Sequence, residues 1–229
     1  MEKGWRATGA RAQERPNKAA HVRVVANHRD PKPSILLAMA SHNEIEIKFR
    51  AADVPALNRR LRKAGFRLVT HRTHEMNTLY DLPGQPLRER GELLRLRKYG
   101  PDWLLTHKAK GKAGRHKTRV ETETKVADGA KMEAILRALG FAPTFRYEKF
   151  RAEWSDGKGH VVVDETPIGN FGEIEGPSRW IDRTAQALQV ARSDYITTTY
   201  SELFFEWKKQ SESCSDEMTF STIQRKPRR

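Results

Sequence analysis

The sequence predicts an α+β fold in which about eight strands, most of them antiparallel, each carry one charged and one apolar face. Residues 44–49 alternate Glu, Glu and Lys with Ile, Ile and Phe, and successive side chains of a strand point to opposite faces. The same Glu-x-Glu-x-Lys spacing recurs at residues 121–125. A helical stripe follows each of these two strands, so we expect a strand–helix–strand unit that repeats around a pseudo-two-fold axis.

The first helix is expected to begin after Asp53, because Asp is a favoured N-cap residue, and to end at Gly65. The second copy has the same signals, with Asp128 at the cap and Gly140 at the end. A third helix is expected near residues 181–191, where apolar positions again recur at helical spacing. These helices need an apolar surface to cover.

The remaining strands are expected at residues 94–97, 105–110, 149–154, 161–164 and 171–175, and they too alternate charged with apolar side chains. A charged face can simply lie in solvent. It can also line the interior of a closed barrel, which has no exposed edge strand. Solvent faces generally contain Thr and mixed polar residues, whereas these positions are nearly all Arg, Lys, Glu or Asp, and this favours the enclosed alternative.

Composition restricts the partners. The chain has 229 residues, a net charge of +14 and a pI near 10.1, which favours an anionic partner such as polyphosphate, nucleic acid or a membrane surface. Cys214 is the one cysteine, so disulfide frameworks and thiolate metal sites are excluded. Apolar runs are shorter than the roughly 18 residues of a membrane-spanning helix. We therefore expect a cytoplasmic protein without a membrane partner.

The chain is expected to have three parts. Residues 1–40 are basic and interrupted by prolines, and are predicted to be a disordered extension in which Met39 is a second candidate start of translation. Residues 41–210 are predicted to form the folded domain, and residues 211–229 a disordered tail. Basic ends of this kind would bind nucleic acid only non-specifically.

These charged motifs, taken in order, resemble the CYTH domain family. This is the family of triphosphate tunnel metalloenzymes, which includes class IV adenylate cyclases, thiamine triphosphatases and inorganic triphosphatases. The similarity covers roughly residues 42–207 and is carried by Glu44-x-Glu46-x-Lys48, Arg95-x-Arg97, Lys108, Glu121-x-Glu123, Lys149-x-Arg151, Asp164 and Phe171-Gly172-Glu173-Ile174-Glu175. The resemblance implies a closed tunnel of eight antiparallel strands, with helices outside and a charged interior that binds a triphosphate and a divalent metal.

The resemblance also implies a role for each matched side chain. The metal ligands would be Glu44, Glu46, Asp164, Glu173 and Glu175. The phosphate-binding residues would be Lys48, Arg95, Arg97, Lys108, Lys149 and Arg151. Lys48 and Glu173 would be catalytic, while Glu121 and Glu123 would orient basic residues or hold a second ion. The chain departs from the family at Lys110, Lys112, Lys117 and Arg119, because this segment contains more basic residues than phosphate binding requires.

The implied activity is Mg²⁺- or Mn²⁺-dependent hydrolysis of the terminal phosphoanhydride of an inorganic, nucleoside or thiamine triphosphate. A class IV adenylate cyclase, which forms cyclic AMP and pyrophosphate from ATP, is the alternative, since both would use the same triphosphate cage. A non-catalytic polyphosphate or nucleic-acid binding module is a third possibility, although aromatic residues are only 8% and no stacking platform is evident. The protein is expected to be a monomer or a homodimer.

Overall fold

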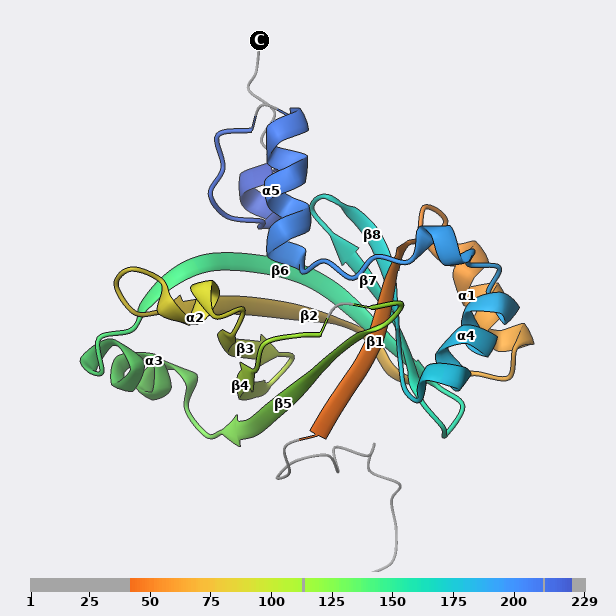
Figure 1. Cartoon of the computed structure of the whole chain (residues 1–229), viewed down its shortest axis with the longest axis horizontal. Coiled ribbons are helices and arrows are strands. Elements are labelled where there is room, and N and C mark those ends of the chain that lie inside the picture. Colours follow the sequence, from red (N-terminus) through yellow and green to blue (C-terminus); the bar gives the residue numbers. More distant parts are fainter. Residues whose placement is uncertain (1–41, 113, 212, 224–229) are drawn as a thin grey trace, which may run out of the picture. The chain divides into compact units, whose positions relative to one another are not determined.

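The computed structural model describes residues 42–112, 114–211 and 213–223 (Figure 1). The strands are β1 (His42–Arg50), β2 (Arg67–Asp81), β3 (Leu93–Tyr99), β4 (Asp102–Lys108), β5 (Lys117–Val126), β6 (Ala142–Ser155), β7 (His160–Thr166) and β8 (Gly169–Glu175). The helices are α1 (Val54–Lys63), α2 (Pro86–Glu89), α3 (Gly129–Ala138), α4 (Ser178–Ala187), the 3₁₀ helix η1 (Arg192–Asp194), α5 (Tyr200–Ser211) and α6 (Phe220–Ile223). The predicted N-terminal extension and Met39 lie outside the described residues.

The strands close into a barrel in the order β1-β5-β4-β3-β2-β6-β7-β8, and every neighbouring pair is antiparallel. This confirms the predicted closed barrel. Raising each strand number by four, and counting past β8 back to β1, reproduces the same set of neighbours. The topology therefore has the two-fold internal symmetry that the repeat indicated.

The two repeated helices begin and end as predicted. Asp53 accepts a hydrogen bond from the backbone N–H of Ala56 at 2.8 Å, and Asp128 accepts one from that of Lys131 at 3.0 Å. Gly65 follows α1 with a φ of +87°, a left-handed conformation that favours glycine. The third helix is displaced from its predicted position, because α4 spans 178–187.

The helices cover the outside of the barrel. Helices α1 and α4 lie together over β1, β7 and β8, where Leu57, Leu61 and Ile181 pack on Ile47 and Ile174 (Figure 1). Helix α3 packs through Leu136 over β3 and β4. The odd-numbered apolar side chains of β1 therefore face outward, which leaves its even-numbered charges facing inward. Among the described helices, none combines the length and apolar character needed to cross a membrane.

The predicted disordered tail needs correction at residues 213–223, which fold back onto the domain. Met218 is fully buried beside Phe145 and Phe204 of β6 and α5. Its backbone N–H donates to the carbonyl of Arg146 at 3.0 Å, and its carbonyl accepts from the N–H of Glu148 at 2.9 Å. Phe220 packs on the ring of Phe150, and Ile223 packs against the same apolar cluster as Met218. These few apolar side chains in a polar stretch form no regular pattern that could have revealed the fold of the segment.

A segment between α4 and α5, residues 189–199, passes over the end of β1, and we call it the strap. Pairing of β1 with β5 stops at Glu46 and Lys117, although β1 continues to Arg50. Beyond that point Lys48 pairs with Ile196 of the strap, through N–H···O distances of 3.0 and 2.7 Å. The strap thus occupies an edge of β1 that β5 leaves free, and it leads directly into α5.

Candidate functional site

The charged faces of the strands converge inside the barrel. Lys149 is 1% exposed and Asp164 is not exposed at all, although neither side chain is apolar. The inward-facing cations are Lys48, Arg95, Arg97, Lys108, Lys117, Arg119, Lys149 and Arg151, and the carboxylates are Glu44, Glu46, Glu75, Glu121, Glu123, Asp164, Glu173 and Glu175. Buried charges need partners, and most of these side chains pair with one another.

Asp164 on β7 lies at the centre of one group of charges. It accepts hydrogen bonds from the ammonium of Lys149 at 3.0 Å, from the guanidinium of Arg151 at 2.6 and 2.7 Å, and from the hydroxyl of Tyr200 at 2.6 Å. These donors occupy both carboxylate oxygens. In this structure Asp164 therefore acts as a counter-ion for the predicted phosphate-binding residues, and its assignment as a metal ligand stays a prediction.

Glu173 and Lys48, the two predicted catalytic residues, face each other across β8 and β1. Glu173 Oε1 lies 2.7 Å from Lys48 Nζ, and its other oxygen accepts from Arg151. Burial opposes the charged forms, but the mutual attraction outweighs it, so the pKa of Lys48 is raised and that of Glu173 lies well below its usual range. Both groups are therefore ionised, and Glu173 holds the ammonium of Lys48 in place.

Glu44 on β1 lies at the centre of a second group. It accepts hydrogen bonds from Lys108 Nζ at 2.8 Å and from Arg119 Nε at 3.0 Å. Lys108 also contacts Glu121 at 2.6 Å. Arg119 was not among the predicted phosphate-binding residues, yet it lies inside the barrel with them.

The predicted arginines of β3 are oriented by the acids of β5. Arg97 Nη2 donates to the carboxylate of Glu123 at 2.9 Å, and Arg95 lies 3.5 Å from the same group. Burial raises the pKa of Glu123, but Arg97 and then Arg95 outweigh it and lower that pKa overall. This geometry supports the orienting role implied for Glu123 and, through Lys108, for Glu121.

Glu46 and Glu175 have few cationic partners. They are register partners on β1 and β8. The cation nearest to Glu46 is Arg119, at 4.0 Å, and Glu175 forms no ion pair within the described ranges. Burial and then the charges of Glu44 and Glu46 raise the pKa of Glu175 to about 8. Crowded carboxylates of this kind suit Mg²⁺ or Mn²⁺, which prefer oxygen ligands.

The five predicted metal ligands are not gathered at one point. In the part of the chain that the structure describes, no three His, Cys, Asp or Glu side chains are grouped so as to hold a metal ion. Glu44 is bound to Lys108 and Arg119, and the counter-ion contacts of Asp164 and Glu173 direct them away from such a group. The donor types at Glu46 and Glu175 fit a divalent cation, and Glu44 is the neighbouring carboxylate whose charge also acts on Glu175.

Several inward-facing residues were not predicted from the sequence, among them Glu75 and Tyr200. Glu75 on β2 is completely buried and lies 3.4 Å from Lys149 Nζ, and its alternation with Asn77 could have revealed it. Tyr200 begins α5 and had no signal in the sequence. Lys117 was recognised only as a surplus basic residue, yet it forms no ion pair within the described ranges, and burial followed by the charge of Arg119 lowers its pKa to about 8.

Comparison with known proteins identifies a matching family and several similar proteins. Residues 42–220 match the family described as the CYTH domain. A candidate adenylate cyclase of Methanocaldococcus jannaschii is 28% identical, over 70% of this chain and 97% of that protein. A solved structure from Vibrio parahaemolyticus is 21% identical with a TM-score of 0.63, over 72% of this chain and 99% of that one.

The structure of HpAC1 from Hippeastrum also has this fold. It is 18% identical with a TM-score of 0.52, and covers 73% of this chain and 96% of its own. That protein is described as a candidate adenylyl cyclase with a dominant triphosphatase activity. Because the family match spans most of the chain and the barrel topology agrees with it, the protein belongs to the CYTH domain family.

Proposed function

We propose that the barrel binds a triphosphate-bearing small molecule together with Mg²⁺ or Mn²⁺ and hydrolyses its terminal phosphoanhydride bond. The observation that carries this proposal is the set of buried cations from different strands that face one enclosed space. Lys48, Arg95 and Lys149 come from β1, β3 and β6, and each is at least nine-tenths buried. Solvation of a polyanion by fixed cations is the function that best accounts for burying so much positive charge.

Carboxylates occupy these cations in the structure as it stands. The phosphate oxygens of a substrate would replace them, since guanidinium groups bind phosphate as readily as carboxylate. Among the described residues, Lys117 has no carboxylate to exchange, and is the cation most ready to accept an anion. Displaced carboxylates would in turn need positive charge, which explains why a triphosphate and a divalent cation would enter together.

A divalent cation would be held by Glu46 and Glu175, with Glu44 as a third donor. When bound, it would supply polarisation of a phosphoryl oxygen and neutralise charge that develops during the reaction. Lys48, held by Glu173 at 2.7 Å, would contact an oxygen of the phosphoryl group that is transferred. Arg95, Arg97 and Lys149 would bind the other oxygens, so that positioning and electrostatics lower the barrier.

Two relatives support different outcomes of this chemistry. The triphosphatase activity described for HpAC1 supports attack of water on the terminal phosphorus. The candidate cyclase from M. jannaschii favours the alternative, in which the ribose 3′-hydroxyl of ATP attacks the α-phosphorus and pyrophosphate leaves. The charged cage serves both reactions equally, so the choice depends on where the rest of the substrate binds.

The test is a substrate panel on the purified full chain. ATP, inorganic triphosphate and thiamine triphosphate are each incubated with Mg²⁺, with Mn²⁺ or with EDTA, and the products are separated by chromatography. We expect metal-dependent release of inorganic phosphate. Cyclic AMP as the main product would establish the cyclase instead, and tight binding without any product would establish the binding module.

A further inference from the structure

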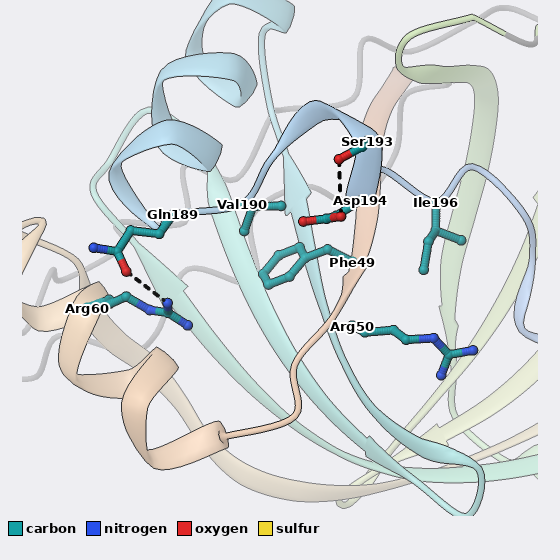
Figure 2. A pocket seen from close by; sticks show the side chains of 8 residues that line it. All are labelled: Phe49, Arg50, Arg60, Gln189, Val190, Ser193, Asp194 and Ile196. Atoms are coloured by element: carbon teal, nitrogen blue, oxygen red, sulfur yellow. Dashed lines mark hydrogen bonds between the residues drawn. The ribbon is translucent and has the colours of Figure 1, made fainter.

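A hollow on the outside of the barrel lies between α1, the end of β1 and the strap. Its volume is about 420 Å³, within the range of small-molecule sites. Figure 2 shows Phe49 and Val190 in its wall, with Arg60 on the α1 side and Arg50 and Ile196 on the other. Arg50 lies on the charged face of β1, beyond Lys48, and its side chain points away from Phe49 (Figure 2). Phe49, Val190 and Arg60 lie outside the charged interior described above.

The hollow contains an arginine without a carboxylate partner. Among the described residues, Arg60 donates from Nη1 to the neutral amide oxygen of Gln189, at 3.3 Å, and its buried Nε has no hydrogen-bond partner. Asp194 is the acid in the lining, and it accepts a hydrogen bond from Ser193 Oγ at 3.3 Å instead of forming an ion pair with Arg60. The guanidinium of Arg60 therefore has unused donors for an anion.

The surface beside Arg60 is apolar. The ring of Phe49 packs directly on Gly172 of β8, where a Cβ atom would come within 2.2 Å of the ring. Val190 packs in the same apolar cluster as Phe49. We propose that the hollow is a second binding site, whose ligand is a small organic anion with an apolar or aromatic body and a carboxylate, phosphate or sulfonate group at Arg60.

The position of this site links it to the interior. Phe49 follows Lys48 on β1, and Ile196 pairs with the backbone of Lys48 at 3.0 and 2.7 Å. The strap then continues to Tyr200, whose hydroxyl donates to Asp164 at 2.6 Å. A ligand that bridges α1 and the strap would hold this path in place, and should therefore tighten the binding of a triphosphate inside. The expected coupling between the outer site and the interior rests on the proposed function.

The site itself is tested with anilinonaphthalene sulfonate, an aromatic anion whose fluorescence reports binding. We expect Arg60→Gln to weaken its binding about tenfold, because a charged donor to the sulfonate is lost. Arg59→Gln removes the same charge from the exposed neighbouring position and should leave binding unchanged. Ser193→Glu, at the exposed rim, should weaken binding without affecting the core. Equal affinity in the Arg60 and Arg59 variants would overturn the proposal.

The coupling is tested by calorimetric titration of inorganic triphosphate with and without saturating probe. We expect about threefold tighter triphosphate binding with the probe, and an equal gain in probe affinity with triphosphate, because coupling between two sites is reciprocal. An unchanged or weaker affinity would overturn the coupling. If triphosphate does not bind at all, the proposed function fails, whereas the outer site still stands or falls with the Arg60 and Arg59 variants.

Discussion

Glu46 of β1 and Glu175 of β8 are register partners on the inner wall of the barrel, at the pair of strands where the first strand meets the last. Neither has a cation closer than 4.0 Å among the described residues. The pairing that closes the barrel therefore brings two weakly compensated carboxylates together. Their repulsion is a property of the closed fold, and a bound cation would relieve it.

Glu46→Gln is expected to remove the stabilisation by metal without disturbing the fold. Without metal the variant should unfold at a slightly higher temperature than the parent protein, since repulsion with Glu175 is removed. Mn²⁺ should stabilise the parent protein and leave the variant nearly unaffected, as a ligand stabilises only the state that binds it. Thermal unfolding with EDTA and with Mn²⁺ measures both effects. Glu89→Gln, on the exposed helix α2, is the control, and equal Mn²⁺ shifts in the two variants would contradict the assignment.

Stability without metal should fall as the pH rises. The pKa of Glu175 is about 8 in the folded protein, whereas an unperturbed Glu side chain, as in the unfolded chain, has a pKa of 4.5. Between these two pH values the folded state therefore binds one more proton than the unfolded state. The resulting stabilisation is fully present below pH 4.5 and is lost as the pH rises through 8. Between about pH 5 and about pH 9 we expect the parent protein to lose on the order of 2 kcal/mol more than Glu175→Gln. Parallel pH profiles would refute this.

Lys117→Met should change stability and binding in opposite directions. Lys117 is half-buried, and its ammonium has no ionic partner among the described residues. Partial burial and then the charge of Arg119 lower its pKa. Its removal should raise the unfolding temperature and weaken the binding of inorganic triphosphate about tenfold. Lys112→Met, in the exposed loop before β5, should do neither. Loss of both stability and binding would instead mark Lys117 as a structural residue.

Glu75→Gln is expected to be strongly destabilising. Glu75 lies within 3.4–3.8 Å of Lys149, Arg97 and Arg151, and its loss leaves these buried cations with one carboxylate fewer, at a cost of about 3 kcal/mol. Burial opposes ionisation of Glu75, but these cations outweigh it and hold its pKa far below 4.5. Its stabilisation is therefore present above pH 4.5 and is lost as the pH falls below that value.

Denaturant unfolding of Glu75→Gln at neutral and acid pH checks both statements. Glu148→Gln is the matched control, because Glu148 lies on the same strand as Lys149 and is more exposed. A variant at Glu75 that is no less stable than the one at Glu148 would show that the interior does not depend on this carboxylate.

Met218→Ala tests the folding of the C-terminal segment. Met218 is completely buried, so truncation to Ala should cost about 2–5 kcal/mol. Met76 on the outer face of β2 is 45% exposed, and Met76→Ala should cost little. The difference in the free energy of unfolding between the two variants measures the contribution of the segment, and two equal values would mean that residues 213–223 are not anchored.

The faces of the strands and the limits of the first helices could be predicted from sequence. Alternation over 44–49 fixed which side of β1 is apolar, and Asp53 with Gly65 fixed α1, because these signals act over a few residues. Tyr200 could not be predicted, since its place beside Asp164 depends on how the strap crosses β1. The shortage of cations at Glu175 likewise depends on strand register, which alternation alone does not specify.

Ribosomal synthesis adds a timing constraint to this architecture. Strand β1 emerges before the other described strands but pairs with β5 and β8, so both of its edges stay unoccupied until those much later strands have been made. Long-range pairing of this kind slows folding and leaves an unfinished sheet open to aggregation. The enclosed space can form only after β8 has left the ribosome, and a nascent chain stalled before that strand would hold its lysines and glutamates in water, unable to act as one site.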